Sequence, residues 1–161
     1  MSLKQKLKTL ALKNVRKAPR HDFSHIWMKV DKSVFKDTIK HLVTLQEYPH
    51  LAVASGNDLG KTIELICNFS VYYGGHLEEI SINISVELPK LKPEIETITD
   101  IIPGALITER EKQELLGVKI KGIPDIRRVF ISDDFPKGMY PWRKDETGPQ
   151  KMVRNMHEVK K

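Results

Sequence analysis

The 161-residue sequence contains a single cysteine, Cys67, and this scarcity excludes several kinds of site at once. One cysteine cannot form a disulfide within the chain, a CxxC redox pair, or an all-cysteine zinc or iron–sulfur site. A reducing compartment is the natural environment for such a chain. Because Cys67 falls on the apolar side of an alternating run, we interpret it as a core residue rather than a reactive thiol.

Long apolar runs are also missing. No stretch approaches the ~18 apolar residues of a membrane-spanning helix, and the N-terminus lacks the apolar segment of a secretory signal. The formal net charge is +6, but much of the excess lies at the two ends, and every charged side chain of residues 1–20 is basic. Because the middle of the chain is closer to neutral, the net charge is weak support for nucleic-acid binding.

The motifs of common catalytic and nucleotide-binding sites are absent. Residues 56–62 end in Gly-Lys-Thr but lack the first glycine of the P-loop spacing, so a hairpin explains them better than ATP binding. His21 and His25 lie four apart in a stretch that a nearby proline disfavours as a helix, which argues against a metal pair. Glu109 and Glu111 would point to different sides of a helix rather than form an acid–base pair. We therefore expect no catalytic, cofactor or metal site in this chain.

Two neighbouring runs alternate apolar and polar residues, which is typical of strands with one buried face. A helix between the first strands has an apolar stripe wide enough to cover that face. The expected elements are strands at residues 26–30, 51–55, 62–73, 78–88 and 95–98, and helices at 2–15, 33–46 and 103–116. We therefore predict an α+β fold: an antiparallel sheet covered on one face by helices, with a long irregular C-terminal tail.

The chain divides by composition into four segments. A basic N-terminal helix or arm (1–20) precedes an α+β domain (21–103), which is followed by a signature helix and partner-wrapping tail (104–150) and a basic C-terminal end (151–161). The tail combines many prolines and glycines with large apolar side chains: Val129, Phe130, Ile131, Phe135, Met139, Tyr140 and Trp142. A tail of this kind is unusual inside a compact domain, so we expect it to lie on another protein.

The stretch from residue 109 to residue 145 concentrates charge among apolar residues. Pairs of arginine and carboxylate have a fixed geometry that suits a rigid docking surface. A salt-bridged surface of a heat-adapted protein is the alternative, since Lys, Glu and Ile are abundant and Gln is scarce. The candidate partner-interface residues are Glu109, Arg110, Glu111, Asp125, Arg127, Arg128, Trp142, Arg143, Lys144 and Asp145.

This stretch resembles the signature of the 30-kDa subunit family of respiratory complex I. The signature runs Ala, Glu-Arg-Glu, Asp-x-x-Gly, His-Pro-Asp-x-Arg-Arg and Arg-Lys-Asp. The matching residues are Ala105, Glu109-Arg110-Glu111, Gly117, Gly122, Pro124-Asp125, Arg127-Arg128 and Arg143-Lys144-Asp145. Ile107 stands where the family usually has Trp, Glu114 where it has Asp, and Ile123 where it has His. The chain therefore looks like a divergent branch, most like the corresponding subunit of archaeal membrane-bound, energy-converting nickel–iron hydrogenases or their sulfur-reducing relatives.

The resemblance implies a cofactor-free hydrophilic subunit of an ion-translocating oxidoreductase complex, on the cytoplasmic side of the cell membrane. Iron–sulfur clusters, and nickel–iron in the hydrogenase branch, would belong to partner subunits. The implied partners are the large subunit (the homologue with the quinone or nickel–iron site), the small iron–sulfur subunit and other peripheral-arm subunits, with the membrane arm touched only indirectly and no nucleic acid. A free-standing basic module that binds RNA or protein is the alternative, although no RNA-binding motif supports it.

Overall fold

The computed structural model describes residues 15–21, 25–45, 49–72 and 79–152. The helix predicted at residues 2–15 lies outside these ranges except for Val15, which begins a strand. That strand, β1 (Val15–His21), pairs with the next one, so the end of the basic N-terminal arm extends the sheet. The register of this pair shifts between Lys17 and Arg20, where Pro19 has no N–H to donate.

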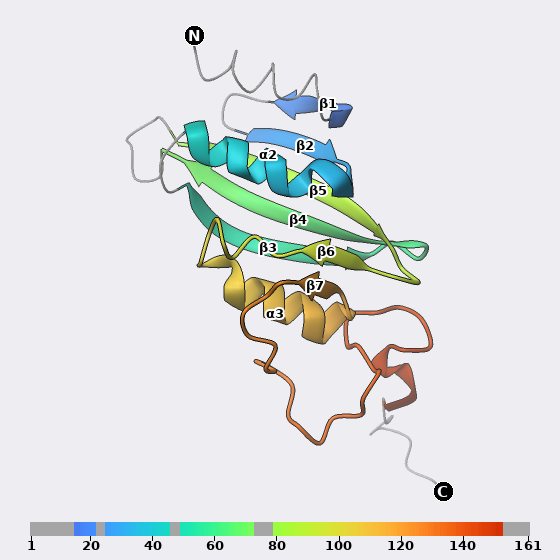
Figure 1. Ribbon diagram of the computed structural model, residues 1–161. Helices are drawn as coiled ribbons and strands as arrows, with labels where there is room; N and C mark the ends of the chain where they lie inside the picture. Colours follow the sequence, from blue (N-terminus) through green and yellow to red (C-terminus); the bar gives the residue numbers. More distant parts are fainter. Residues whose placement is uncertain (1–14, 22–24, 46–48, 73–78, 153–161) are drawn as a thin grey trace, which may run out of the picture.

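A five-stranded sheet in the order β1-β2-β5-β4-β3 forms the centre of the molecule (Figure 1). Its remaining strands are β2 (His25–Val30), β3 (His50–Asp58), β4 (Thr62–Val71) and β5 (Ile80–Pro89). The antiparallel pairing of β3 with β4 and of β4 with β5 agrees with the prediction, but β2 runs parallel to β5. The sheet is therefore mixed rather than wholly antiparallel, because the helix after β2 carries the chain back across the sheet before β3 begins.

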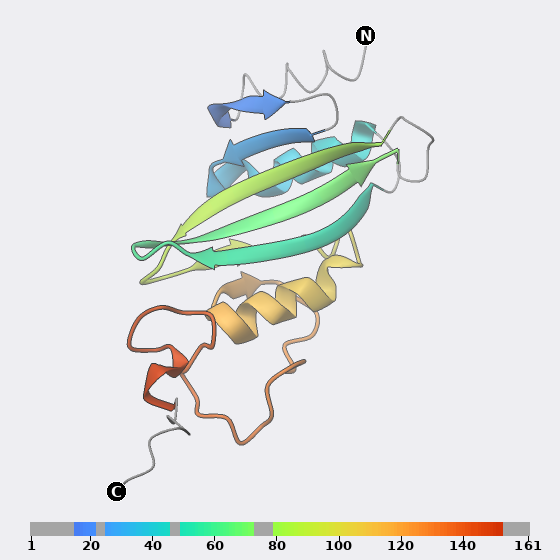
Figure 2. The ribbon, with the colours of Figure 1, turned by 180° about the vertical axis from the view of Figure 1, so that it is seen from behind.

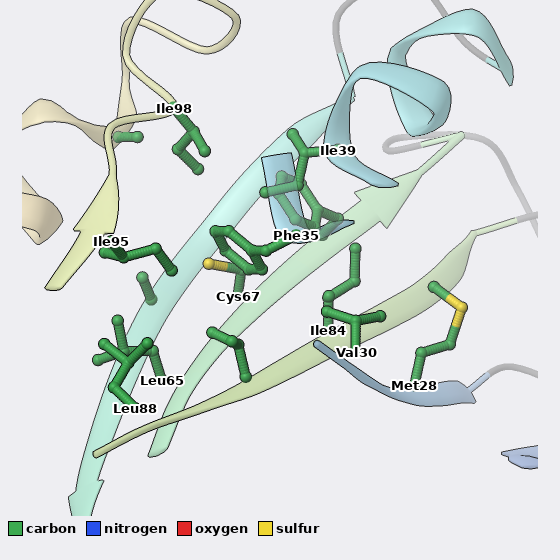
Figure 3. Packing of buried hydrophobic residues seen from close by; sticks show 14 of the residues in the cluster. Met28, Val30, Phe35, Ile39, Leu65, Cys67, Ile84, Leu88, Ile95 and Ile98 are labelled. Atoms are coloured by element: carbon green, nitrogen blue, oxygen red, sulfur yellow. The ribbon is translucent and has the colours of Figure 1, made fainter. Parts of the chain in front are cut away.

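Helix α2 (Lys32–Leu45) covers one face of this sheet, as its apolar stripe predicts (Figure 1). The inward residues of the two alternating strands are buried: Ile63, Leu65, Cys67, Phe69, Val71, Ile82, Ile84, Val86 and Leu88. Figure 3 shows Phe35 of α2 beside Cys67. Burial raises the pKa of the Cys67 thiol to about 12, so this cysteine is a core residue, as expected.

A second, two-stranded parallel sheet consists of β6 (Glu94–Glu96) and β7 (Lys119–Lys121). Helix α3 (Ala105–Leu116) connects these strands. Together with β7 it lies beyond the β3 side of the main sheet in both views, whereas β6 overlaps β3 (Figures 1 and 2). The strand predicted at residues 95–98 thus corresponds to β6, but its partner is β7 and not the main sheet. The helix ends at residue 116, as predicted, and Gly117 after it has φ +67°, the left-handed conformation of a glycine cap.

The hairpin predicted at residues 56–62 has a shorter turn than the predicted strand ends at 55 and 62 imply, because β3 continues to Asp58. Gly56 is a strand residue whose missing side chain makes room for α3: a Cβ there would lie 2.5 Å from Leu116 Cδ1. The reversal is confined to residues 59–61, where Gly60 has φ +89°. The glycine at position 56 therefore allows close packing of the helix on the strand and does not make a turn.

After β7 the described chain is irregular up to residue 148, and a short 3-10 helix, η1 (Pro149–Met152), follows. We call residues 122–148 the tail. It folds back beside α3 (Figure 1), and it is the long irregular C-terminal segment that the sequence predicts.

Candidate partner interface

Helix α3 holds the preceding loop through a buried carboxylate. Glu109 is 8% exposed, and it accepts hydrogen bonds from the Thr97 hydroxyl at 2.5 Å and from the Ile98 N–H at 2.7 Å. Burial raises the pKa of Glu109 above its ordinary value, although these two hydrogen bonds and the nearby Lys36 act in the opposite direction. The first residue of the Glu-Arg-Glu motif is thus an internal link between α3 and the segment after β6.

Arg110 fixes the first part of the tail on the other side of the helix. Its guanidinium donates to the backbone carbonyls of Arg127 (2.7 Å) and Arg128 (3.1 Å) and lies 3.2 Å from the Asp125 carboxylate. Asp125 also accepts from the backbone and side chain of Arg127, at 2.8–3.1 Å. The hydrogen bonds from the Arg127 side chain are the main cause of the lowered pKa of Asp125. The predicted Arg–carboxylate pairs therefore exist, and Arg110 joins helix to tail through them.

Glu114 fixes the next part of the tail, although sequence reasoning did not select it. Its carboxylate accepts hydrogen bonds from three successive backbone N–H groups, those of Val129, Phe130 and Ile131. Burial alone would raise the pKa of Glu114, but these hydrogen bonds lower it below the ordinary value. The available signal was that Glu114 stands where the family has Asp, since both side chains end in a carboxylate.

The C-terminal end of α3 is capped by the tail. The backbone N–H of Trp142 donates to the Leu115 carbonyl at 3.0 Å, and the Arg143 side chain donates to the Leu116 carbonyl at 2.7 Å. A Cβ at Gly117 would lie 2.5–2.7 Å from three ring atoms of Tyr140, so this glycine is required by space as well as by its φ. Carbonyls at a helix end need such partners when they are not hydrated.

The Arg-Lys-Asp motif is tied to the main sheet by a charged bridge. The Lys90 ammonium lies 2.6 Å from the carboxylates of both Asp58 and Asp145. Asp58 is buried, and it also accepts from the backbone N–H of Lys144 at 2.8 Å. Burial alone would raise the pKa of Asp58, but these hydrogen bonds lower it, and the Lys90 contact is the main cause of a lowered pKa at Asp145. Asp58 and Lys90 were not predicted, because nothing in the sequence brings them together.

The remaining candidates contribute smaller contacts. Arg128 donates to the Ser132 carbonyl at 2.7 Å and so stiffens the tail itself. Glu111 pairs with the neighbouring Lys112. The buried Lys112 ammonium lies 5.1 Å from the centroid of the Trp142 ring, a cation–π contact, while the indole stays partly exposed. Eight of the ten predicted residues thus belong to α3 or contact it, whereas Lys144 and Asp145 contact Asp58 and Lys90. Many of their charges are used inside the chain.

In contrast to these charges, several large apolar side chains of the tail face solvent. Ile126 is 77% exposed, Phe130 62% and Val129 37%. Across the part of the chain that the structure describes, we find no group of His, Cys, Asp and Glu that could hold a metal ion. In the same residues no helix has the length and apolar character needed to cross a bilayer.

Comparison with known proteins identifies a family and several relatives of this chain. Residues 28–151 match the family described as "Respiratory-chain NADH dehydrogenase, 30 Kd subunit". Membrane-bound hydrogenase subunit beta of Pyrococcus furiosus is 34% identical over 131 residues, which are 81% of this chain and 75% of that protein. A subunit of the F(420)H(2) dehydrogenase of Methanosarcina mazei is 30% identical over 128 residues, which are 79% of this chain and 79% of that protein.

Two solved structures have the same fold. A chain of the membrane-bound sulfane sulfur reductase, an archaeal respiratory membrane complex, aligns with a TM-score of 0.70 and 20% identity, over 88% of this chain and 81% of that one. A trypsin-resistant fragment of Nqo5 aligns with a TM-score of 0.63 and 19% identity, over 78% of this chain and 99% of the fragment. At these identities the alignments establish the α+β fold.

Proposed function

The chain belongs to the respiratory-chain NADH dehydrogenase 30 Kd subunit family, and from this premise we propose that it is a cofactor-free assembly subunit of a membrane-bound, complex I-like oxidoreductase. The complex would be of the hydrogenase or sulfur-reductase type and coupled to ion translocation. In it the chain docks, on the cytoplasmic side, onto the large catalytic subunit and the small iron–sulfur subunit. The 34% identity with membrane-bound hydrogenase subunit beta supports this branch.

The observation that carries the docking role is the construction of the tail. Its irregular backbone follows a defined path because Arg110, Glu114, Arg143 and the Asp58–Lys90–Asp145 bridge bind it at successive points. Yet the same segment leaves Ile126 and Phe130 largely in solvent. A stiff segment with exposed large apolar side chains is typical of a surface that another protein covers.

A tagged chain recovered from detergent-solubilised native membranes tests this function. We expect mass spectrometry to identify a large catalytic subunit, a small iron–sulfur subunit and antiporter-like membrane proteins with it. The metal ligands of the large subunit would then define the branch. Recovery of the chain alone, or with RNA, would overturn the proposal and favour the free-standing binding module.

The cofactor-free character needs a separate measurement on the purified chain. We expect no visible absorption band and no stoichiometric iron, nickel or zinc after purification under reducing, oxygen-free conditions. A metal that remains bound in stoichiometric amount would contradict it, because a resident cofactor would then belong to this subunit.

A further inference from the structure

The carboxylates that hold residues 125–131 and the apolar side chains of that stretch are arranged in opposite senses. These two carboxylates turn inward: the Asp125 side chain is 19% exposed, and Glu114 of α3 is occupied by three backbone N–H groups. The apolar residues beside them turn outward, with Ile126 and Phe130 the most exposed large apolar side chains of the tail. The two carboxylates therefore act as supports for a stretch that exposes large apolar side chains.

The supports fix this apolar surface on both sides. Asp125 is held by Arg110 directly before Ile126. The carbonyls of Arg127 and Arg128 are held by the same arginine, and the N–H of Phe130 is held by Glu114. Because the backbone on each side of the two apolar residues is bound to one helix, little backbone conformational entropy remains to be lost when they bind.

The surface between the two apolar residues is positively charged. The Arg127 side chain is 83% exposed, whereas its partner Asp125 is 19% exposed, so this ion pair presents its guanidinium to solvent. A planar guanidinium recognises a carboxylate with a defined geometry. A lipid surface would call for several basic side chains free to approach it. Of the two arginines between Ile126 and Phe130, Arg128 donates to the carbonyl of Ser132, whereas Arg127 is the exposed member of an ion pair and favours a defined carboxylate partner.

We propose that Ile126, Arg127 and Phe130 form the contact through which this chain docks on its partner subunit, and that the partner offers an apolar pocket with a carboxylate at its rim. The inference rests on the proposed function and specifies which tail residues touch the partner. The proposed contact thus consists of exposed side chains. The carboxylates of Asp125 and Glu114 bind within the chain and hold these side chains in position. Large apolar and arginine side chains are the usual anchors of protein interfaces.

The test is a double substitution, Ile126→Ser with Phe130→Ser, in the tagged full-length chain expressed in the native host. We expect the partner yield per bait to fall at least about tenfold, with an unchanged circular dichroism spectrum and melting temperature. Arg127→Glu should lower the yield too, because it brings a negative charge to the rim carboxylate. Leu91→Ser, at a fully exposed leucine between β5 and β6, is the matched control and should not lower it.

Three results would overturn the inference. The first is an undiminished partner yield with the double variant. The second is an equal loss of partner yield with Leu91→Ser. The third is a double variant that keeps its partner subunits but loses self-association or binding to anionic vesicles. In the first case the partners are still recovered, so the proposed function stands while the contact residues are wrong. If the unmodified chain recovers no oxidoreductase subunit, the proposed function itself fails.

Discussion

The main sheet and the tail of this protein are stabilised in different ways. The sheet with α2 buries a continuous apolar cluster in which Phe69, Ile82 and Leu88 are almost fully covered. The tail buries few side chains and is attached by individual hydrogen bonds and ion pairs. Apolar burial acts over a whole surface, whereas each attachment of the tail depends on a few atoms. The sheet should thus tolerate changes of charge that loosen the tail.

The largest effect is expected from a cavity in the sheet. Phe69→Ala removes a ring that is 1% exposed and should lower the free energy of unfolding by about 3–5 kcal/mol. Denaturant titration followed by circular dichroism measures it, with the exposed Val53→Ala as control. A loss below about 1 kcal/mol would mean that the sheet is not the main source of stability.

The bridge between tail and sheet should come next. Lys90→Met leaves the buried carboxylate of Asp58 without its cation, so the free energy for opening residues 144–147 should fall by about 3 kcal/mol. Hydrogen exchange of the amides at Lys144 and Thr147 reports this opening. Lys92→Met, at a side chain that is mostly exposed, should leave these amides as protected as before. Equal exchange in both variants would show that the bridge is not an attachment point.

A comparison of alanine substitutions at Gly117 and Gly138 distinguishes the cost of backbone strain from the cost of lack of space. Both have positive φ, but only at Gly117 would a Cβ meet the ring of Tyr140. Gly138→Ala should cost about 1 kcal/mol, and Gly117→Ala about 1–2 kcal/mol more, with fluorescence changes from the displaced Tyr140 and Trp142. Equal costs in the melting curves would show that the ring moves aside freely.

Acid should affect the tail and the segment after β6 in opposite directions. The pKa values of Glu114 and Asp145 are lowered in the folded chain, so their contribution is present above the ordinary values of 4.5 and 3.8 and is lost as the pH falls through the folded values. The pKa of Glu109 is raised, so its contribution is present below 4.5 and is lost as the pH rises through the folded value. Amide exchange, corrected for intrinsic rates, should therefore show residues 129–131 and 147 opening below pH 4 before Ile98 does. Simultaneous opening would contradict this order.

The smallest effect on stability is expected at the exposed arginines. Arg127→Ala with Arg128→Ala should leave the chain folded, with a melting temperature lowered by no more than about 2–4 °C, because ion pairs in solvent contribute little. Assembly with partner subunits should nevertheless be impaired. An unfolded double variant would identify these residues as internal supports.

The strands and helices were predictable where a pattern repeats within a few residues. The alternation in β4 and β5, the stripe of α2 and the end of α3 at residue 116 are local features, and the structure confirms each. The parallel partner of β2 was not predictable in this way, since the pairing of distant strands leaves no local pattern. The same limit explains why the predicted strand ended at residue 55, before Gly56, since the packing of α3 on Gly56 leaves no local pattern.

The sequence by itself determined the α+β class, the irregular tail and the family to which the chain belongs. Only the tertiary structure decided that Glu109 binds inside the chain, that Glu114 holds the tail, and that Asp58, Lys90 and Asp145 form one bridge. The physical reason is distance along the chain. Lys144 and Asp58 lie 86 residues apart, and whether two such groups meet depends on the packing of every element between them.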